Sequence, residues 1–130
     1  GCADPFCRRP YPWGHEDAQM LARYQAMTAM RNVHPVLRTG ECVYLAPCAD
    51  VLGVIRTNES GRDAFGSQAE NACAVTLINR SAKEVVVYLT AEDVCGAKTL
   101  VTDDGQTLSA RGGAFSVKVK GLQGMTGFAE

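Results

Sequence analysis

The sequence predicts a mainly β protein, in which an antiparallel β-sandwich follows a loop and one α-helix. Three observations predict this fold class. Apolar side chains recur at helical spacing between residues 17 and 32, and from residue 41 onward short β-branched and aromatic runs are separated by turn residues about every 8 to 12 positions. The 130 residues suffice for one compact domain with a core, but not for a closed (β/α)₈ barrel, which needs about 250.

Residues 1–16 are predicted to form a loop, because their prolines and glycine suit neither helix nor strand interiors. These residues are Pro5, Pro10, Pro12 and Gly14. A helix is expected over residues 17–32, with Asp17 as a suitable N-cap. Pro35 ends it by disfavouring helical geometry at the residue before it. The apolar positions on one face of this helix are Met20, Leu21, Tyr24 and Met27.

Strand-like patterns begin after Gly40. Strands are expected near residues 41–47, 51–57, 73–80, 84–91, 97–102 and 113–120. Phe115, Val117 and Val119 alternate with polar residues, which indicates one buried and one solvated face of an antiparallel sheet. Residues 79–83 and 103–105 are predicted to be hairpin turns, and residues 58–70 a longer polar loop.

Charge and hydropathy exclude two classes of partner. Thirteen Lys and Arg balance 14 Asp and Glu without a basic block, so no nucleic acid is expected. The longest apolar runs, such as residues 85–89, are far shorter than a membrane-spanning helix, so no membrane partner is expected. The start of the chain lacks an initiator Met and the features of a signal peptide. We therefore expect that an upstream segment has been removed.

The six cysteines are Cys2, Cys7, Cys42, Cys48, Cys73 and Cys95. No Cys-x-x-Cys pair occurs, and His15 and His34 are not at metal-ligand spacing, so no metal site is predicted. Cys42 and Cys73 lie in apolar strand-like runs, where a reduced thiol acts as a small hydrophobe. Free thiols indicate a reducing, cytoplasmic location. A disulfide framework and a thiol or metal module remain the alternatives.

No nucleophile elbow, phosphate-binding loop, dinucleotide fingerprint or metalloprotease helix is present. Ser60 and Ser67 lack the flanking glycines of a nucleophile elbow and are interpreted as loop residues. His15 and His34 flank the predicted helix and are interpreted as structural. The carboxylates lie mainly at turns and strand ends, which is typical of solvated surface charge.

The N-terminal loop does contain one notable group of side chains: Asp4, Arg8, Arg9, Tyr11 and Trp13. Carboxylate and guanidinium groups can bind vicinal hydroxyls in pairs, and flat aromatic rings can stack on a sugar. This composition favours carbohydrate binding. Two structural alternatives are a salt bridge between Asp4 and Arg8, and a core position for Trp13.

The order of these residues adds a family resemblance. The residues that carry it are Asp4-Pro5-Phe6-Cys7-Arg8, Met30-Arg31, Pro35-Val36-Leu37-Arg38-Thr39-Gly40, Asp50–Arg56 and Ile78-Asn79-Arg80-Ser81. They resemble the α-amylase family (glycoside hydrolase family 13), most clearly its neopullulanase, cyclomaltodextrinase and maltogenic amylase branch, with Met30 where that branch has leucine. Residues 1–40 then correspond to the last loop and helix of a catalytic barrel. Residues 41–130 correspond to a Greek-key C-terminal sandwich, domain C.

This resemblance implies a parent enzyme that acts on α-glucans (starch, pullulan, maltodextrins or cyclodextrins) with retention. The catalytic Asp, Glu and Asp of the family would lie upstream of Gly1, so the chain itself is expected to be a non-catalytic structural domain. Asp4 and Arg8 match motif positions that bind substrate on the donor side of the cleft. The chain needs no cofactor, although calcium can bind elsewhere in such a parent.

The alternative hypothesis is a free-standing carbohydrate-binding sandwich. Exposed aromatic residues on a sheet face would favour it, whereas the inward position expected for Phe115 counts against it. In either case the apolar face of the helix needs a partner. We expect this face to pack on the sandwich or to form a homodimer through residues 17–32.

Overall fold

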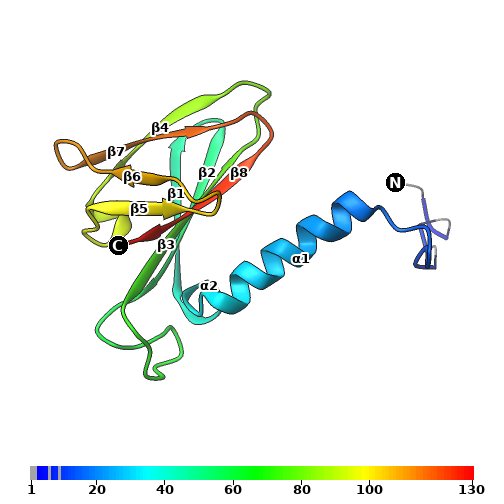
Figure 1. Ribbon diagram of the computed structural model, residues 1–130, viewed down its shortest axis with the longest axis horizontal. Coiled ribbons are helices and arrows are strands. Elements are labelled where there is room, and N and C mark those ends of the chain that lie inside the picture. Colours follow the sequence, from blue (N-terminus) through cyan, green and yellow to red (C-terminus); the bar gives the residue numbers. More distant parts are fainter. Residues whose placement is uncertain (1–2, 6, 9) are drawn as a thin grey trace. The chain divides into compact units, whose positions relative to one another are not determined.

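The computed structural model describes residues 3–5, 7, 8 and 10–130 (Figure 1). The chain forms two compact units, Gly1–Val33 and His34–Glu130. The first holds the loop and the long helix α1, and the second holds the short helix α2 (Val36–Thr39) and all the strands. Residues 34–40, which the sequence assigned with the helix, thus belong to the same compact unit as the sandwich.

Helix α1 spans Ala18–Val33, in agreement with the predicted range. The Oδ1 atom of Asp17 accepts hydrogen bonds from the backbone N–H groups of Gln19 and Met20, at 3.0 and 2.9 Å. These bonds satisfy two amide groups that the first helical turn would otherwise leave unpaired. The predicted N-cap is therefore confirmed, and the helix ends two residues before Pro35.

The apolar face of α1 is not covered by the other residues described in its own unit. No residue of this helix is buried, and the exposed fractions of Met20, Tyr24 and Met27 are 53%, 64% and 61%. An amphipathic helix obtains most of its stability from packing this face against another element. The residues described within its own unit do not supply such a cover.

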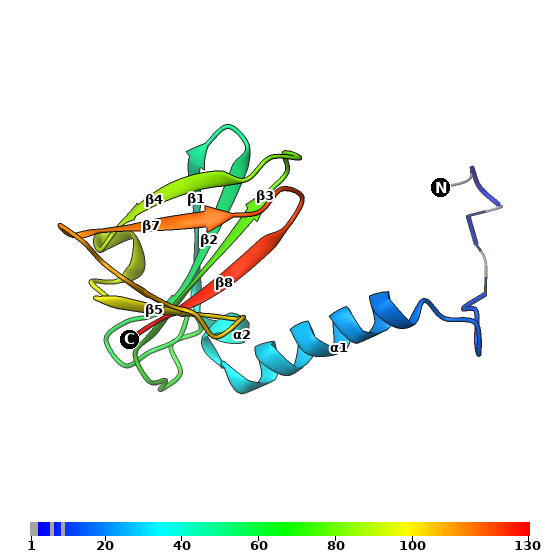
Figure 2. The same cartoon turned by 45° about the horizontal axis from the view of Figure 1, so that its top comes forward.

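The second unit is an antiparallel sandwich of two unequal sheets, which confirms the predicted fold class (Figures 1 and 2). Six strands form one sheet in the order β1-β2-β3-β8-β5-β6, and β4 and β7 form the second layer. The strands are β1 (Glu41–Cys48), β2 (Val51–Asn58), β3 (Ala72–Asn79), β4 (Val85–Thr90), β5 (Thr99–Thr102), β6 (Thr107–Ser109), β7 (Ala114–Val119) and β8 (Gly124–Ala129). A 3₁₀ turn, η1 (Glu92–Val94), precedes β5.

All six predicted strands are present, and two further strands, β6 and β8, were not predicted. One predicted hairpin is wrong. Residues 79–83 do not join hydrogen-bonded neighbours, because β3 pairs with β2 and β8 while β4 pairs with β7 in the other sheet. This segment is a crossing between layers. The turn at residues 103–105 does join the paired strands β5 and β6.

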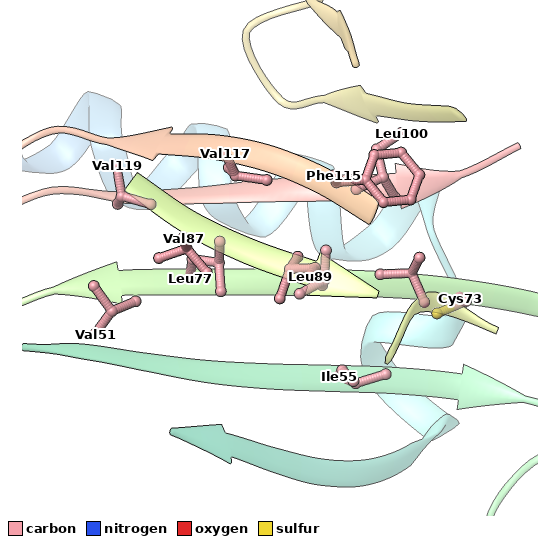
Figure 3. Packing of buried hydrophobic residues seen from close by; sticks show 12 residues of the cluster. Val51, Ile55, Cys73, Leu77, Val87, Leu89, Leu100, Phe115, Val117 and Val119 are labelled. Carbon is pink, nitrogen blue, oxygen red and sulfur yellow. The ribbon is translucent and has the colours of Figure 1, made fainter. Parts of the chain in front are cut away.

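The core lies between the two sheets (Figure 3). It contains Val51, Ile55, Cys73, Val75, Leu77, Val87, Leu89, Val94, Leu100, Phe115, Val117 and Val119. Alternate residues of β4 and β7 point into it, so Phe115 is 1% exposed while Tyr88 is 72% exposed. The inward position predicted for Phe115 is confirmed. No helix in the described part of the chain is long and apolar enough to cross a bilayer.

Candidate functional site

The N-terminal loop pairs the two residues that the sequence proposed for substrate binding. Nε of Arg8 lies 2.6 Å from Oδ1 of Asp4, and the Arg8 N–H donates to the carbonyl of Pro5 at 3.1 Å. The Cys7 thiol donates to the same Asp4 oxygen at 3.5 Å. The side chains remain 77% and 59% exposed, so the pair contributes little to stability. The salt bridge that the sequence offered as an alternative is thus present, and the substrate-binding role stays a prediction.

The two aromatic side chains of this loop also meet. The rings of Tyr11 and Trp13 pack edge to face with centroids 4.6 Å apart, and the backbone N–H of Trp13 donates to the Tyr11 carbonyl at 2.9 Å. Trp13 is 80% exposed, so within this chain it is not the core residue that the structural alternative required. An exposed indole held by a neighbouring ring can stack on a sugar. Arg9, the remaining member of the predicted group, lies outside the described residues.

Two carboxyl groups with shifted pKa values, Glu16 in the loop and Asp104 in the sandwich, are poor candidates for proton donors. The Gly14 N–H donates to Oε1 of Glu16 at 2.9 Å and lowers the pKa of that carboxyl. In the sandwich, hydrogen bonds from the Thr102 hydroxyl and the Gln106 backbone lower the pKa of Asp104. A general acid needs a raised pKa to keep its proton at neutral pH. The pKa values of Glu16 and Asp104 are lowered instead, so both carboxyl groups are ionised at neutral pH and suited only to binding.

The two histidines show no catalytic arrangement. The His34 ring stacks on Phe128 of β8 with centroids 3.7 Å apart and planes inclined by 17°. His15 lies exposed in the loop, where its backbone N–H donates to the Pro12 carbonyl at 2.9 Å. Residues 3–5, 7, 8 and 10–130 contain no cluster of three His, Cys, Asp or Glu side chains that could hold a metal ion.

The described cysteines are free thiols in different surroundings. Cys7, Cys48 and Cys95 are exposed, whereas Cys73 is buried in β3. Burial raises the pKa of Cys73, and the neighbouring Cys95 thiol raises it further. Cys2 lies outside the described residues. The described cysteines form no disulfide with one another, and the reduced state of Cys42 and Cys73 stays a prediction.

A groove on the sandwich, missed by sequence reasoning, carries a second candidate site. It encloses about 590 Å³ and is lined by Tyr88, Thr107, Leu108, Ser109, Arg111, Ala114, Phe115 and Ser116. Tyr88 and Ser116 face each other across β4 and β7, and β6 forms another wall. An exposed phenol, three hydroxyls and a guanidinium are the groups that recognise a sugar. The groove could not be predicted because β6 was not.

Comparisons with known proteins relate nearly the whole chain to amylopullulanases. It is 29% identical over 129 residues to an amylopullulanase of Thermoanaerobacterium saccharolyticum, covering 96% of the chain and 10% of the relative. An amylopullulanase of Thermoanaerobacter thermohydrosulfuricus is 30% identical over 125 residues, covering 95% and 8%. The chain thus spans about a tenth of the length of these relatives. No protein-family model matches it.

Solved structures share the fold. An Anoxybacillus α-amylase superposes with a TM-score of 0.78 and 19% identity over 99% of this chain and 26% of that one. The α-amylase AmyP, solved with maltotriose, gives a TM-score of 0.71 with 19% identity over 89% and 22%. The chain is therefore homologous to a short segment of amylopullulanases and has the fold of part of an α-amylase. The resemblance predicted from the sequence is confirmed to this extent.

Proposed function

We propose that this chain is the C-terminal part of an α-amylase-like glycoside hydrolase that cleaves α-glucans with retention. The observation that carries the proposal is that the similarity to amylopullulanases extends over 95% or more of the chain, through both compact units. A free-standing sandwich module would not need to share the loop and helix. The neopullulanase-like branch that the N-terminal motif resembles is part of this proposal.

The chain itself contributes structure and not catalysis. A retaining glycosidase needs a nucleophile and a protonated acid about 5 to 5.5 Å apart. In the loop, Asp4 is held by Arg8, and the pKa of Glu16 is lowered and not raised. The isolated chain should release no reducing sugar from pullulan or soluble starch above a no-protein blank. Release of sugar that persists through repurification would contradict this part of the proposal.

Asp4 and Arg8 are proposed to bind glucose hydroxyls on the donor side of the parent's cleft. Their exposed ion pair presents a carboxylate and a planar guanidinium together, which suits two neighbouring hydroxyls. In the complete enzyme, Arg8→Ala should raise KM for maltodextrins with a smaller effect on thermal stability. Arg23→Ala, on exposed helix α1, is the matched control for loss of one guanidinium. Equal KM values for both variants would contradict the assignment.

The uncovered face of α1 is proposed to dimerise in the isolated chain. Met20, Tyr24 and Met27 follow one another at helical spacing and are more than half exposed. Sedimentation velocity should show a dimer that Met27→Glu dissociates. Gln25→Glu, which adds the same charge at another exposed position of α1, should leave the dimer intact. A wild-type chain that stays monomeric at all concentrations would contradict dimerisation.

A free-standing carbohydrate-binding module is the second candidate function, and the Tyr88 groove favours it. Affinity electrophoresis in gels containing amylopectin should show retarded migration that Tyr88→Ala or Arg111→Ala abolishes. Tyr44→Ala removes an equally exposed tyrosine from β1 outside this groove and should leave retardation unchanged. Unretarded migration of the wild-type chain would exclude this candidate.

A further inference from the structure

Two cysteines that the proposed function does not use share one cavity. The cavity encloses about 580 Å³ beside the end of β2, the start of β3 and the turn after η1, and both Cys73 and Cys95 line it. Cys73 lies on β3 and is 5% exposed. Cys95 is exposed and follows η1 with a left-handed backbone, φ 57°. One thiol is thus accessible from solvent, while the other lies at the edge of the core.

Thr57 is a neighbour of both thiols. Thr57 of β2 is paired directly with Cys73 of β3, and Cβ atoms of opposed residues in an antiparallel pair lie about 4.5 to 5.5 Å apart. The Cys95 Sγ donates to Oγ1 of Thr57 at 3.2 Å. The side chain of Cys95 therefore reaches the inner face of the six-stranded sheet next to Cys73.

The contact also affects the protonation of Cys73. Burial has the largest effect in raising the pKa of the Cys73 thiol, and the next causes are a hydrogen bond and a charge interaction with Cys95. Both interactions require the two sulfur atoms to be neighbours. A disulfide needs Cβ atoms about 3.5 to 4.5 Å apart, a distance set by the backbone, and rotation about the Cα–Cβ bonds then brings the two sulfur atoms together.

We propose that Cys73 and Cys95 are a reversible dithiol–disulfide pair, oxidised by a low-molecular-weight disulfide such as oxidised glutathione. The exposed Cys95 reacts first: its thiolate attacks one sulfur of the oxidant, forms a mixed disulfide and releases one glutathione. Cys73 then loses its proton, attacks Sγ of Cys95 and displaces the second glutathione. The protein loses two S–H bonds and gains one S–S bond, and the oxidant leaves as two thiols that carry the protons.

The raised pKa of Cys73 explains why Cys95 takes the first step, because only the thiolate is nucleophilic. The disulfide would close a covalent loop from residue 73 to residue 95, and this loop contains the crossing to β4 and β4 itself. It would link β3, in the six-stranded sheet, to the turn after β4 and η1, where β4 is the first strand of the smaller sheet. Such a link restricts the unfolded chain and raises the melting temperature.

The experiment uses the full chain with the other four cysteines replaced: Cys2→Ser, Cys7→Ser, Cys42→Ala and Cys48→Ser. After equilibration with oxidised and reduced glutathione, intact mass spectrometry should show the loss of two hydrogen atoms and no attached glutathione. The melting temperature should rise by roughly 5 to 10 °C and return on reduction. Adding Cys95→Ser or Cys73→Ala should abolish both changes.

Two results would overturn the proposal. One is a chain that accumulates glutathione on Cys95 while Cys73 stays reduced, which would mean that the sulfur atoms cannot approach. The other is an oxidised fraction no larger in the folded chain than in the urea-unfolded chain at the same glutathione ratio. In that case the fold would not favour the disulfide.

Discussion

Replacement of the Asn79 side chain should lower the free energy of unfolding by a large amount for a side chain of its size. Asn79 ends β3, is 1% exposed and stands where the chain crosses to the second sheet. Its Nδ2 donates to the carbonyls of Lys83, Val119 and Lys120 at 2.8, 3.0 and 3.3 Å. Its Oδ1 accepts from the N–H and hydroxyl of Ser81 at 2.9 and 2.8 Å. One amide therefore ties the end of β3 to the end of β7.

The expected cost of Asn79→Ala follows from these contacts. Each hydrogen bond contributes about 1 kcal/mol net, and a buried carbonyl left without a donor costs about 1 to 3 kcal/mol. The Nδ2 group has two hydrogens for its three acceptors, so the contacts do not add fully. We expect the free energy of unfolding to fall by about 3 to 4 kcal/mol, a large fraction of the roughly 5 to 15 kcal/mol typical of a domain.

Urea unfolding followed by far-UV circular dichroism would measure this loss. Tryptophan fluorescence is unsuitable, because the single tryptophan lies exposed in the loop. Arg80→Ala is the control: its side chain is 77% exposed and its Nε lies 3.7 Å from Oδ1 of Asp50, so the change should stay below about 0.5 kcal/mol. Equal losses for Asn79→Ala and Arg80→Ala would refute the reasoning.

Three further changes test other parts of the fold. Asp17→Ala removes the N-cap and should weaken α1 by about 1 kcal/mol, seen as lost helical signal in circular dichroism that Asp17→Asn retains. Gly121→Ala places a Cβ against the Ala82 carbonyl group and should lower the free energy of unfolding by about 2 kcal/mol, measured in urea, whereas an unchanged urea midpoint would contradict this close approach. The pKa of Asp104 is lowered in the folded state, so its contribution to folding stability is present at neutral pH and is lost below roughly pH 4. On acidification the melting temperature of Asp104→Asn should therefore fall less than that of the wild type.

Most of the fold could be predicted where periodicity was strong. The alternation of Phe115, Val117 and Val119 with polar residues identified β7 and its buried face, and helical spacing identified α1. Strand β6 has three residues, too few for a period, and β8 contains Gly124 and Gly127, which are poor strand formers. Burial of β8 between β3 and β5 outweighs that propensity.

The wrong hairpin has a physical cause. Polar residues around Asn79 and Ser81 predict a change of direction equally well for a hairpin and for a crossing between sheets. The side chain of Asn79 decides between them here, because it donates to carbonyl groups of the last residue of β7 and of the residue after it, 40 or more positions along the chain. Such a contact has no local signal in the sequence.

The candidate sites also differ in how well the sequence could predict them, depending on whether their residues are close together in the sequence. Residue types singled out the N-terminal loop, and the family resemblance then selected Asp4 and Arg8, which meet in that loop. The Tyr88 groove and the Cys73–Cys95 pair join elements distant in the sequence, and each depends on sheet register. In β4 the exposed Tyr88 stands within five consecutive apolar residues, so no alternation of polar and apolar residues marked it as exposed.

The coding sequence upstream of Gly1, translated in the same frame for several hundred codons, tests the central proposal most directly. The account predicts a continuous frame that encodes barrel strands with the catalytic Asp, Glu and Asp of the α-amylase family. A start codon or a secretion signal immediately before Gly1 would contradict it. The carbohydrate-binding module centred on Tyr88 would then become the favoured function.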